Sequence, residues 1–297
     1  MERLTTLLLI VLLLITCSSK QSFDHKFFKA GESRGVLDNK KINEASGLAS
    51  SIKNPGMLWT HNDSGNKAEI FLIDDEAKCI GTIHFPGLEN RDWEDIAVGP
   101  GPDENESYIF IGEIGDNYSQ YEYKYIYRLR EPLIGKEIKS VDVDIHQVDS
   151  IKFNLSDGAR DTEALMVDPL TRDIYIFSKR EKQIGLYVLP FPQSTTDVIT
   201  AQFVLHLPFT QINAADFSSD GKEVLIKNYH QVYYWRKQKD NETLAELLTG
   251  KPAYLPYVTE PQGESITFDR SGKGYYTLSE KINNKEPHLM YYKRKEK

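Results

Sequence analysis

The sequence contains few cysteines and none of the common cofactor-binding spacings. Of its 297 residues only Cys17 and Cys79 are cysteines. Cys17 directly follows the apolar run of residues 1–16, so Cys79 is the one cysteine in the rest of the chain. It therefore has no partner there for an internal disulfide. We find no Cys/His spacing for zinc, no glycine loop that would cradle phosphates and no dinucleotide fingerprint. These absences exclude disulfide-stapled, zinc-binding and nucleotide-binding classes, and they require an apolar core to hold the fold.

Positive charge is also scarce. The chain has 36 Lys and Arg against 44 Asp and Glu, which gives a formal net charge of -8. Apart from the terminal "YYKRKEK", no segment concentrates basic residues. Proteins that bind nucleic acids present a basic stripe or face to the phosphates. We therefore predict no nucleic-acid partner.

The N-terminal segment has the character of a targeting sequence. Residues 1–16, "MERLTTLLLIVLLLIT", form an apolar run of signal-peptide length, and the stretch Leu14-Ile15-Thr16-Cys17 resembles a bacterial lipobox. We predict a signal peptide over 1–16, then a lipidated Cys17 and a tether over 17–35. The membrane is then a partner through the lipid, and the location is the bacterial cell envelope, at the outer membrane. The alternative is an ordinary secretory signal with an accidental cysteine.

A repeated pattern fills the rest of the chain. Its copies start at "NEASGLAS", "DWEDIAVG", "DTEALMVD", "NAADFSSD" and "GESITFDR". When the copies are aligned on Glu44, Glu94, Glu163, Ala214 and Glu264, the spacings are 50, 69, 51 and 50. Each copy reads as a strand, a turn rich in Asp, Pro or Gly, a second strand, a Tyr-rich third strand and a weaker fourth.

Four antiparallel strands in each unit of about 50 residues predict an all-β fold of the β-propeller type. The repeat count gives five blades, with six as the alternative. We predict one domain over 36–297, closed by a strand from the segment "SRGVLDNKKI" that completes the last blade. One short helix is expected at "NETLAELLTG", with Asn241 as its N-cap.

This topology brings scattered polar residues to one axial face. In a propeller blade, the first strand begins and the second strand ends on the same face. Metal-ligand candidates there are Glu44, Glu94, Asp116, Glu163 and Glu264. Ligand-binding candidates there are His61, Asn62, Asp63, Lys179, Arg180, Lys227 and Glu280.

The ring of carboxylates has three interpretations. Each could brace a neighbouring blade by accepting backbone hydrogen bonds. Together they could hold a hard cation such as Ca²⁺, which takes six to eight oxygen ligands. Closely spaced carboxyl groups could also exchange protons as acid and base. The basic groups Lys179, Arg180 and Lys227 would either clamp an anion or form internal salt bridges with the glutamates.

The repeated motifs also carry a resemblance to known proteins. The segments "LWTHNDSGN", "DWEDIAVGPG", "IGEIGDN" and "RDTEALMVDPLTRDIYIFSKRE" resemble an uncharacterised group of bacterial secreted or lipid-anchored β-propeller proteins, over about residues 40–296. More distantly they resemble phytase-like and esterase-like propellers with a similar D-x-E motif. The first resemblance implies no reaction. The second implies a cation-dependent phosphoesterase, with Glu94, Glu163 and Glu44 at matching positions and Ala214 departing from the pattern.

Two functional hypotheses follow from these observations. The first is an envelope protein that binds a ligand or protein partner through its acidic axial face. The second is a Ca²⁺-dependent hydrolase of phosphate esters or lactones at the same face, with Glu94, Glu163 and Asp116 as ligands and Lys179 and Arg180 holding the anion. The fold alone does not separate them, because propellers host both.

Overall fold

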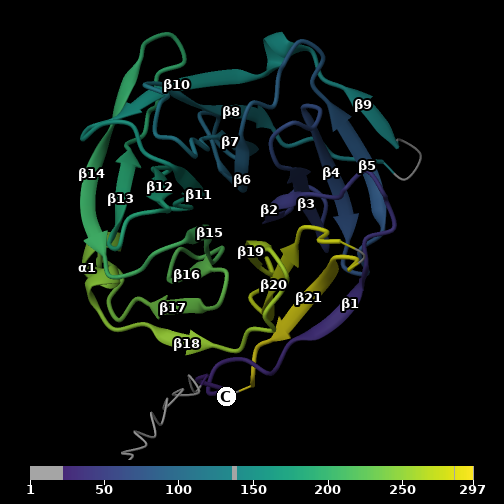
Figure 1. The fold of residues 1–297 in the computed structure, drawn as a ribbon, viewed down its shortest axis with the longest axis vertical. Helices are drawn as coiled ribbons and strands as arrows, with labels where there is room; N and C mark the ends of the chain where they lie inside the picture. Colours follow the sequence, from purple (N-terminus) through teal and green to yellow (C-terminus); the bar gives the residue numbers. More distant parts are fainter. Residues whose placement is uncertain (1–22, 136–138, 284, 297) are drawn as a thin grey trace, which may run out of the picture.

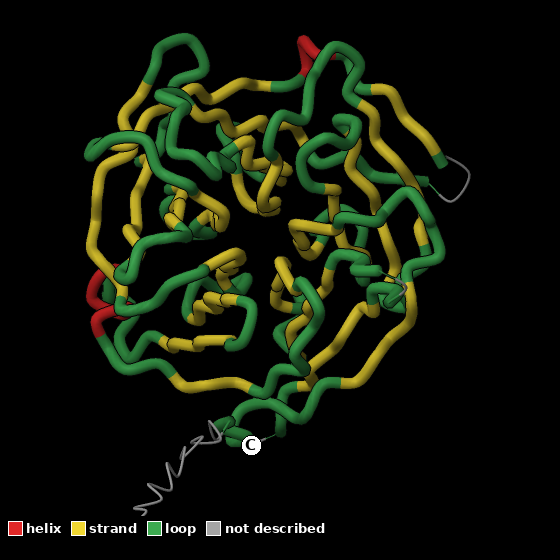
Figure 2. Tube along the Cα trace, in the orientation of Figure 1, coloured by secondary structure: helices red, strands yellow, loops and turns green. Residues whose placement is uncertain are grey.

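The protein is a β-propeller, as the repeat predicts. The computed structural model describes residues 23–135, 139–283 and 285–296. Strands dominate these residues, and they form sheets arranged radially around a central axis (Figures 1 and 2). Strand pairing gives sheets of four, eight, four and five strands within the described residues, and the eight-stranded sheet consists of two four-stranded halves joined by one parallel strand pair. We describe these sheets as five four-stranded units and number them blades 1 to 5.

The first three blades follow the chain. Blade 1 contains β2 (Ala45–Ser50), β3 (Met57–Asn62), β4 (Glu69–Asp74) and β5 (Cys79–His84). Blade 2 contains β6 (Trp93–Pro100), β7 (Ser107–Glu113), β8 (Lys124–Arg130) and β10 (Asp149–Leu155). Blade 3 contains β11 (Thr162–Val167), β12 (Ile174–Ser178), β13 (Ile184–Leu189) and β14 (Ile199–Leu207).

The last two blades complete the ring. Blade 4 contains β15 (Ile212–Phe217), β16 (Glu223–Asn228), β17 (Val232–Arg236) and β18 (Ala253–Leu255). Blade 5 contains β19 (Gly263–Phe268), β20 (Gly274–Ser279), β21 (His288–Lys293) and β1 (Glu32–Val36). The first strand of each blade lies innermost, and these five strands contact one another in sequence around the axis (Figure 1).

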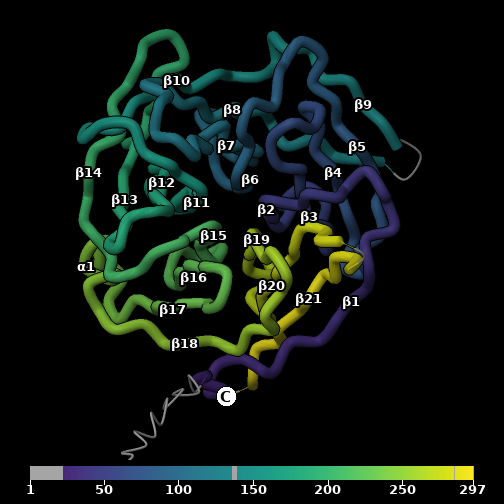
Figure 3. The backbone as a smooth tube through the Cα atoms, in the orientation of Figure 1, coloured from purple at the N-terminus to yellow at the C-terminus, as the bar shows by residue number. Residues whose placement is uncertain are grey.

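The N-terminal strand closes the ring. β1 pairs antiparallel with β21, and Figure 3 shows the purple start of the chain beside its yellow end. Phe28 is fully buried in the cluster between blades 4 and 5. The propeller therefore begins before residue 36, and the described part of the predicted tether belongs to the domain. Cys17 and the signal peptide lie outside the described residues.

The long spacing within blade 2 has a structural explanation. After β8 the chain returns to blade 1, where β9 (Ser140–Asp142) pairs parallel with β5 as an additional edge strand. A 3₁₀ turn, η1 (Ile145–Gln147), then leads back to β10, which pairs parallel with β14 and joins the outer edges of blades 2 and 3. The extra residues thus cover exposed strand edges.

The helix α1 (Leu244–Thr249) forms at the predicted place, but Asn241 is not its N-cap. Thr243 caps the helix and forms a reciprocal capping box with Glu246, which satisfies two backbone N–H groups at once. The sequence "TLAE" holds this signature, whereas Asn241 lies too early to reach the first turn. In the described part of the chain, no helix has the length and apolar character needed to cross a bilayer.

Apolar packing between neighbouring blades holds the ring together. Five clusters of buried residues lie at the blade interfaces, and each draws its members from two adjacent blades. Alternating apolar residues on both faces of each sheet supply these clusters, which explains the wholly buried inner strands β2, β11 and β19. The polar loops at the strand ends are left free to build a site.

Two aspartates, one buried and one half-buried, also link the blades, and neither occupies the repeated glutamate position. Asp95 of blade 2 accepts hydrogen bonds from the backbone N–H of Ile96 and, across the interface, of Leu165 in blade 3, both at 2.9 Å. Asp216 of blade 4 accepts from the N–H of Phe268 in blade 5 at 2.8 Å. The bracing role therefore exists, and it belongs to Asp95, one residue after Glu94, and to Asp216, two residues after Ala214.

Candidate functional site

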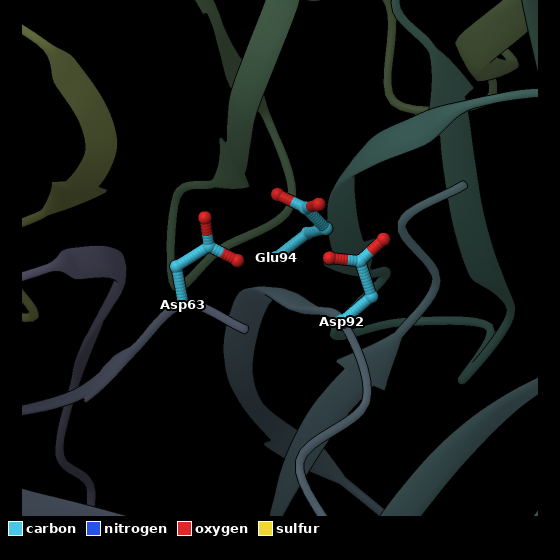
Figure 4. Close-up of side chains that lie close together, drawn as sticks. All are labelled: Asp63, Asp92 and Glu94. Carbon is cyan, nitrogen blue, oxygen red and sulfur yellow. The ribbon is translucent and has the colours of Figure 1, made fainter. Parts of the chain in front are cut away.

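A first group of carboxylates lies at the axial start of blades 1 and 2. Asp63 follows β3, Asp92 precedes β6, and Glu94 is its second residue. One carboxylate oxygen from each of the three residues lies within 4.8 Å of the other two (Figure 4). Asp92 and Glu94 flank Trp93 at the start of β6, where the register of the β6–β7 ladder shifts between Trp93 and Asp95. We call Asp63, Asp92 and Glu94 the first carboxylate group.

A second group shares Asp63 with the first. Glu264 belongs to β19 and Glu280 directly follows β20, so both come from blade 5. Their carboxylates and that of Asp63 again offer oxygens within 4.8 Å of one another. Asp63 thus lies between the two groups. We call Asp63, Glu264 and Glu280 the second carboxylate group.

These groups border a polar pocket on the axial face. The pocket has a volume of about 260 Å³ and is lined by Asp63, Glu94, Asn117, Glu163, Lys179, Arg180, Gln211, Tyr229, Gln262 and Glu264. The lining comes from all five blades or the loops that follow their strands. The ring topology is what brings together residues that lie up to 200 positions apart in sequence.

Both predicted basic groups of the pocket are engaged in ion pairs. The Lys179 Nζ lies 2.7 Å from an oxygen of Glu163 and 3.8 Å from one of Glu264. Arg180 pairs with Asp161 and donates to the Asn117 side chain, while its own side chain keeps 45 % of its exposure. The internal salt bridges that we set against an anion clamp therefore exist, and Arg180 still reaches the pocket surface.

None of the four repeated glutamates accepts a backbone hydrogen bond from a neighbouring blade within the described residues. Glu163 is held by Lys179, Glu264 accepts from the Tyr229 hydroxyl, and Glu44 accepts from the Asn66 amide. Glu94 is only 4 % exposed, forms no ion pair in the described structure, and shares a side-chain hydrogen bond with the carboxyl group of Glu163. The bracing interpretation therefore does not explain Glu94.

Burial and crowding of like charge raise the carboxyl pKa values here. Burial is the larger cause in each case, and neighbouring carboxylates add to it. The pKa of Asp63 rises to about 6, that of Glu163 to about 7 despite Lys179, and that of Glu280 to about 10. The pKa of Glu94 rises well above its usual range, with Glu163 as the main charged neighbour. The folded protein without a cation therefore favours protons in this pocket.

These shifts predict that the cation-free protein loses stability as the pH rises. A carboxyl group whose pKa is raised by folding binds protons more tightly in the folded state than in the unfolded state. Its contribution to the free energy of unfolding is therefore fully present at a pH below the unfolded pKa and is lost as the pH rises to the folded pKa. For Asp63 and Glu163 the decline falls between about pH 4 and 7. Urea unfolding in the presence of chelator, repeated across this pH range, should show the decline in the free energy of unfolding. The decline should be smaller in an Asp63→Asn, Glu163→Gln double variant. An identical decline in that variant would contradict the assignment.

The backbone of the loop after β7 packs closely against the first carboxylate group. The loop after β7 places Gly115 so that an added Cβ would lie 2.2 Å from an oxygen of Glu94 and 2.4 Å from the Asp92 carboxylate. The Gly115 N–H also donates to the Asp92 carbonyl at 3.1 Å. Only glycine lets the backbone approach the carboxylates in this way. The donor set, all oxygen and without His or Cys, suits a hard divalent cation rather than zinc or copper.

Several predicted site residues serve the structure instead. His61 is fully buried against Trp93, and burial lowers its pKa to about 4. Lys227 is also fully buried, donates to the Gly263 carbonyl and has its pKa lowered to about 8 by burial. Asn62 joins two loops by accepting from the Glu44 N–H at 3.1 Å and donating to the Lys41 carbonyl at 2.6 Å. These three side chains do not line the pocket.

Three of the predicted metal ligands, Asp116, Glu44 and Glu163, lie outside both carboxylate groups. Asp116 accepts hydrogen bonds from the N–H groups of Gln120 and Tyr121, at 2.8 and 2.9 Å, and so closes its own loop. The Glu44 carboxylate accepts a hydrogen bond from the Asn66 side chain. It lies outside the second carboxylate group, and its negative charge adds to the causes that raise the pKa of Glu280. Glu163 lines the pocket as the partner of Lys179.

The list of site candidates from the sequence omitted Asp92, Tyr229 and Gly115. The two-residue spacing in "DWE" carried a signal for Asp92, because alternate residues of a strand share a face. Tyr229 and Gly115 lie in loops that follow second strands, and nothing in their local sequence separates them from ordinary loop residues. Only the folded ring shows their contacts.

Comparison with known proteins reveals likeness in fold only. No protein-family model and no curated protein sequence matches the chain. Among solved structures, the Dos1 propeller is similar with 13 % identity and a TM-score of 0.37, covering 83 % of this chain and 59 % of that one. Hydrazine synthase from Kuenenia stuttgartiensis is similar with 12 % identity and a TM-score of 0.39, and the alignment covers 78 % of this chain and 61 % of that one. This chain thus spans about three fifths of each of these two proteins.

A third similar structure is XC5397 from Xanthomonas campestris, described as a gluconolactonase. It is 10 % identical with a TM-score of 0.46, and the alignment covers 89 % of each chain. At such identities and scores, none of these likenesses supports an argument about the activity of this protein.

Proposed function

We propose that the axial pocket binds a divalent cation, preferably Ca²⁺, and that the loaded pocket recognises a small anionic ligand. The observation that supports this most strongly is the first carboxylate group, in which three acidic side chains converge within 4.8 Å. Glu94 is buried there, its side-chain hydrogen bond is to another acid, Glu163, and no base forms an ion pair with it among the described residues. Leaving a buried carboxylate uncompensated is costly, and a bound cation removes that cost.

The oxygen-only donor set favours Ca²⁺ over other cations. Ca²⁺ accepts carboxylates and carbonyls at about 2.3–2.6 Å in flexible geometry, whereas Mg²⁺ demands a near-ideal octahedron. Two segments supply these oxygens, the loop after β3 with Asp63 and the start of β6 with Asp92 and Glu94, and the backbone beside Gly115 lies close to them. Such an assembly from separate segments suits the more adaptable ion.

The pocket size and its basic rim favour a small anionic ligand over a protein partner. A volume of about 260 Å³ leaves room for a cation with a group the size of a phosphate or carboxylate. Arg180 borders the pocket and is half exposed, so its guanidinium can contact an anion that also ligates the cation. Binding at this face is therefore our preferred function.

Hydrolysis of a phosphate ester or lactone is the second candidate. Its support is that Asp63 and Glu163 line the pocket with pKa values of about 6 and 7, raised mainly by burial. A carboxyl group that titrates near neutrality beside a cation can accept a proton from an attacking water. Turnover of such substrates by the Ca²⁺-loaded protein, abolished in Glu163→Gln, would select this candidate over binding alone.

For the cellular setting, we propose attachment to the bacterial cell envelope through lipid on Cys17. This proposal depends on the sequence of residues 1–17 alone, because the described residues begin at Phe23. In that setting the axial pocket would face an extracytoplasmic compartment, where Ca²⁺ is available to weak sites. Metabolic labelling with a fatty acid, lost in Cys17→Ala, would test the anchor.

Thermal unfolding of the full chain in detergent tests cation binding. We expect saturating Ca²⁺ to raise the melting temperature by about 5–10 °C over that in chelator, since a ligand at 100 times its Kd adds about 2.7 kcal/mol. Glu94→Gln should lose most of this response. Its melting temperature in chelator should be equal to or above that of the parent, because a buried like charge has been removed.

Glu44→Gln is the matched control, because Glu44 lies on the same face but outside both carboxylate groups. It should keep the full Ca²⁺ response. An unresponsive parent protein, combined with a strongly destabilised Glu94→Gln, would mean that Glu94 is structural and would overturn the proposal.

A further inference from the structure

We propose that a second divalent cation binds beside the first, held by Asp63, Glu264 and Glu280, with the Asp63 carboxylate shared between the two ions. This inference rests on the proposed function and deepens it. The two carboxylate groups meet only at Asp63, since their other members come from blade 2 in one case and blade 5 in the other. Asp63 therefore lies within reach of two separate pairs of acids, one from blade 2 and one from blade 5.

The strongest support for the second site is Glu280. This residue is 7 % exposed, its Oε1 atom is buried without a donor N–H or hydroxyl group in the described structure, and its side-chain contact is with another acid, Glu264. The backbone N–H of Glu280 donates to the Gln262 carbonyl at 3.0 Å, which fixes the start of its side chain at the axial end of β20. A buried carboxylate oxygen without a donor is unusual and costly. A cation between Glu280, Glu264 and Asp63 would satisfy it.

Charge in the pocket also favours two ions over one. Six carboxyl groups converge here, namely Asp63, Asp92, Glu94, Glu163, Glu264 and Glu280. Among the ion pairs of the described residues, Lys179 is the one base that pairs directly with members of this set. Five negative charges then remain if all six groups are ionised. One divalent cation reduces them to three, and two reduce them to one.

Lys179 is placed to respond to the second ion. Its ammonium lies 2.7 Å from Glu163 but 3.8 Å from Glu264, so the weaker contact is with the member of the second group. Glu264 can turn to a cation while Lys179 keeps Glu163 as its partner. Carboxylate-bridged cation pairs typically stand about 3.5–4 Å apart, which a single shared aspartate can span.

Equilibrium dialysis of the full chain against radioactive Ca²⁺ tests this arrangement by stoichiometry. We expect two bound ions per chain at saturation. Glu280→Gln should lower the number to one, and so should Asp92→Asn, because each removes a ligand from only one group. Asp63→Asn should bind none. Glu44→Gln serves as the control that keeps two, and circular dichroism checks that each variant is folded.

The possible results separate this inference from the proposed function. A parent that binds no Ca²⁺ overturns both. A parent that binds one ion, retained in Glu280→Gln and lost in Asp92→Asn, leaves the proposed function intact and overturns the second site. A single ion that is lost in Glu280→Gln and retained in Asp92→Asn overturns the paired arrangement and moves the cation to blade 5.

Discussion

Replacing Asp63 by asparagine is expected to abolish the stabilisation of the protein by Ca²⁺. Asp63 is the only residue common to the two carboxylate groups, so this change removes a charged ligand from both. We expect apparent Ca²⁺ affinity to fall by at least about 100-fold, a larger loss than outer-shell substitutions cause. The measurement is the melting temperature as a function of Ca²⁺ concentration, compared with the parent and with Glu44→Gln.

The same variant should fold normally without a cation. Asparagine keeps a side-chain oxygen that can accept the Ser64 N–H hydrogen bond that Asp63 accepts now. It also removes a group whose pKa is raised to about 6, mainly by burial, and so relieves repulsion at neutral pH. An Asp63→Asn protein that is stable in chelator yet responds to Ca²⁺ like the parent would refute the role of Asp63 as the shared ligand.

Replacing Glu131 by glutamine is expected to cause the largest loss of stability, about 3–5 kcal/mol. Glu131 follows β8 and is 3 % exposed. It accepts hydrogen bonds from the Trp59 indole at 2.9 Å, the Ser107 hydroxyl at 2.7 Å and the N–H of Ile52 and Lys53 at 3.1 Å. Glutamine would turn an NH₂ group toward some of these donors and leave them buried without an acceptor.

This second change should leave Ca²⁺ binding intact. Glu131 contacts the turn that follows β2, whereas the axial pocket lies where β2 begins, so the two regions occupy opposite ends of the blade. Urea unfolding gives the stability loss, and the Ca²⁺-induced shift in melting temperature gives the response of the site. A stability loss below about 1 kcal/mol would show that the hydrogen bonds around Glu131 contribute little.

The fold could be predicted from the sequence because its signals are local and repeated. Each hairpin carries its own turn chemistry, as in "SSDGK", where Gly221 adopts the left-handed φ of 67°. The fifty-residue period then implies a ring. The closing strand predicted in "SRGVLDNKKI" is observed as β1, but β1 starts at Glu32, before the predicted domain boundary at residue 36, because polar and exposed residues give no apolar strand pattern.

The site was predicted in outline but not in detail. Topology alone places Glu94, Glu264 and Asp63 on one face, and the structure brings their carboxylates to the same pocket. Sequence does not reveal how far a side chain enters the core. His61 and Lys227 follow the same positional rule as Asp63 and Lys179, yet both are fully buried outside the pocket. Packing between blades determines whether these two side chains are buried, and the pattern of strands in the sequence gives no information about that packing.

The most direct test of cation binding is an anomalous difference map from crystals of the protein grown with Ca²⁺. We predict a peak bounded by carboxylate oxygens of Asp63, Asp92 and Glu94 at about 2.3–2.6 Å. A second peak is expected between Asp63, Glu264 and Glu280. A map without a peak at the first position, with the three carboxylates converging as they do here, would contradict the central claim that this pocket is a cation site.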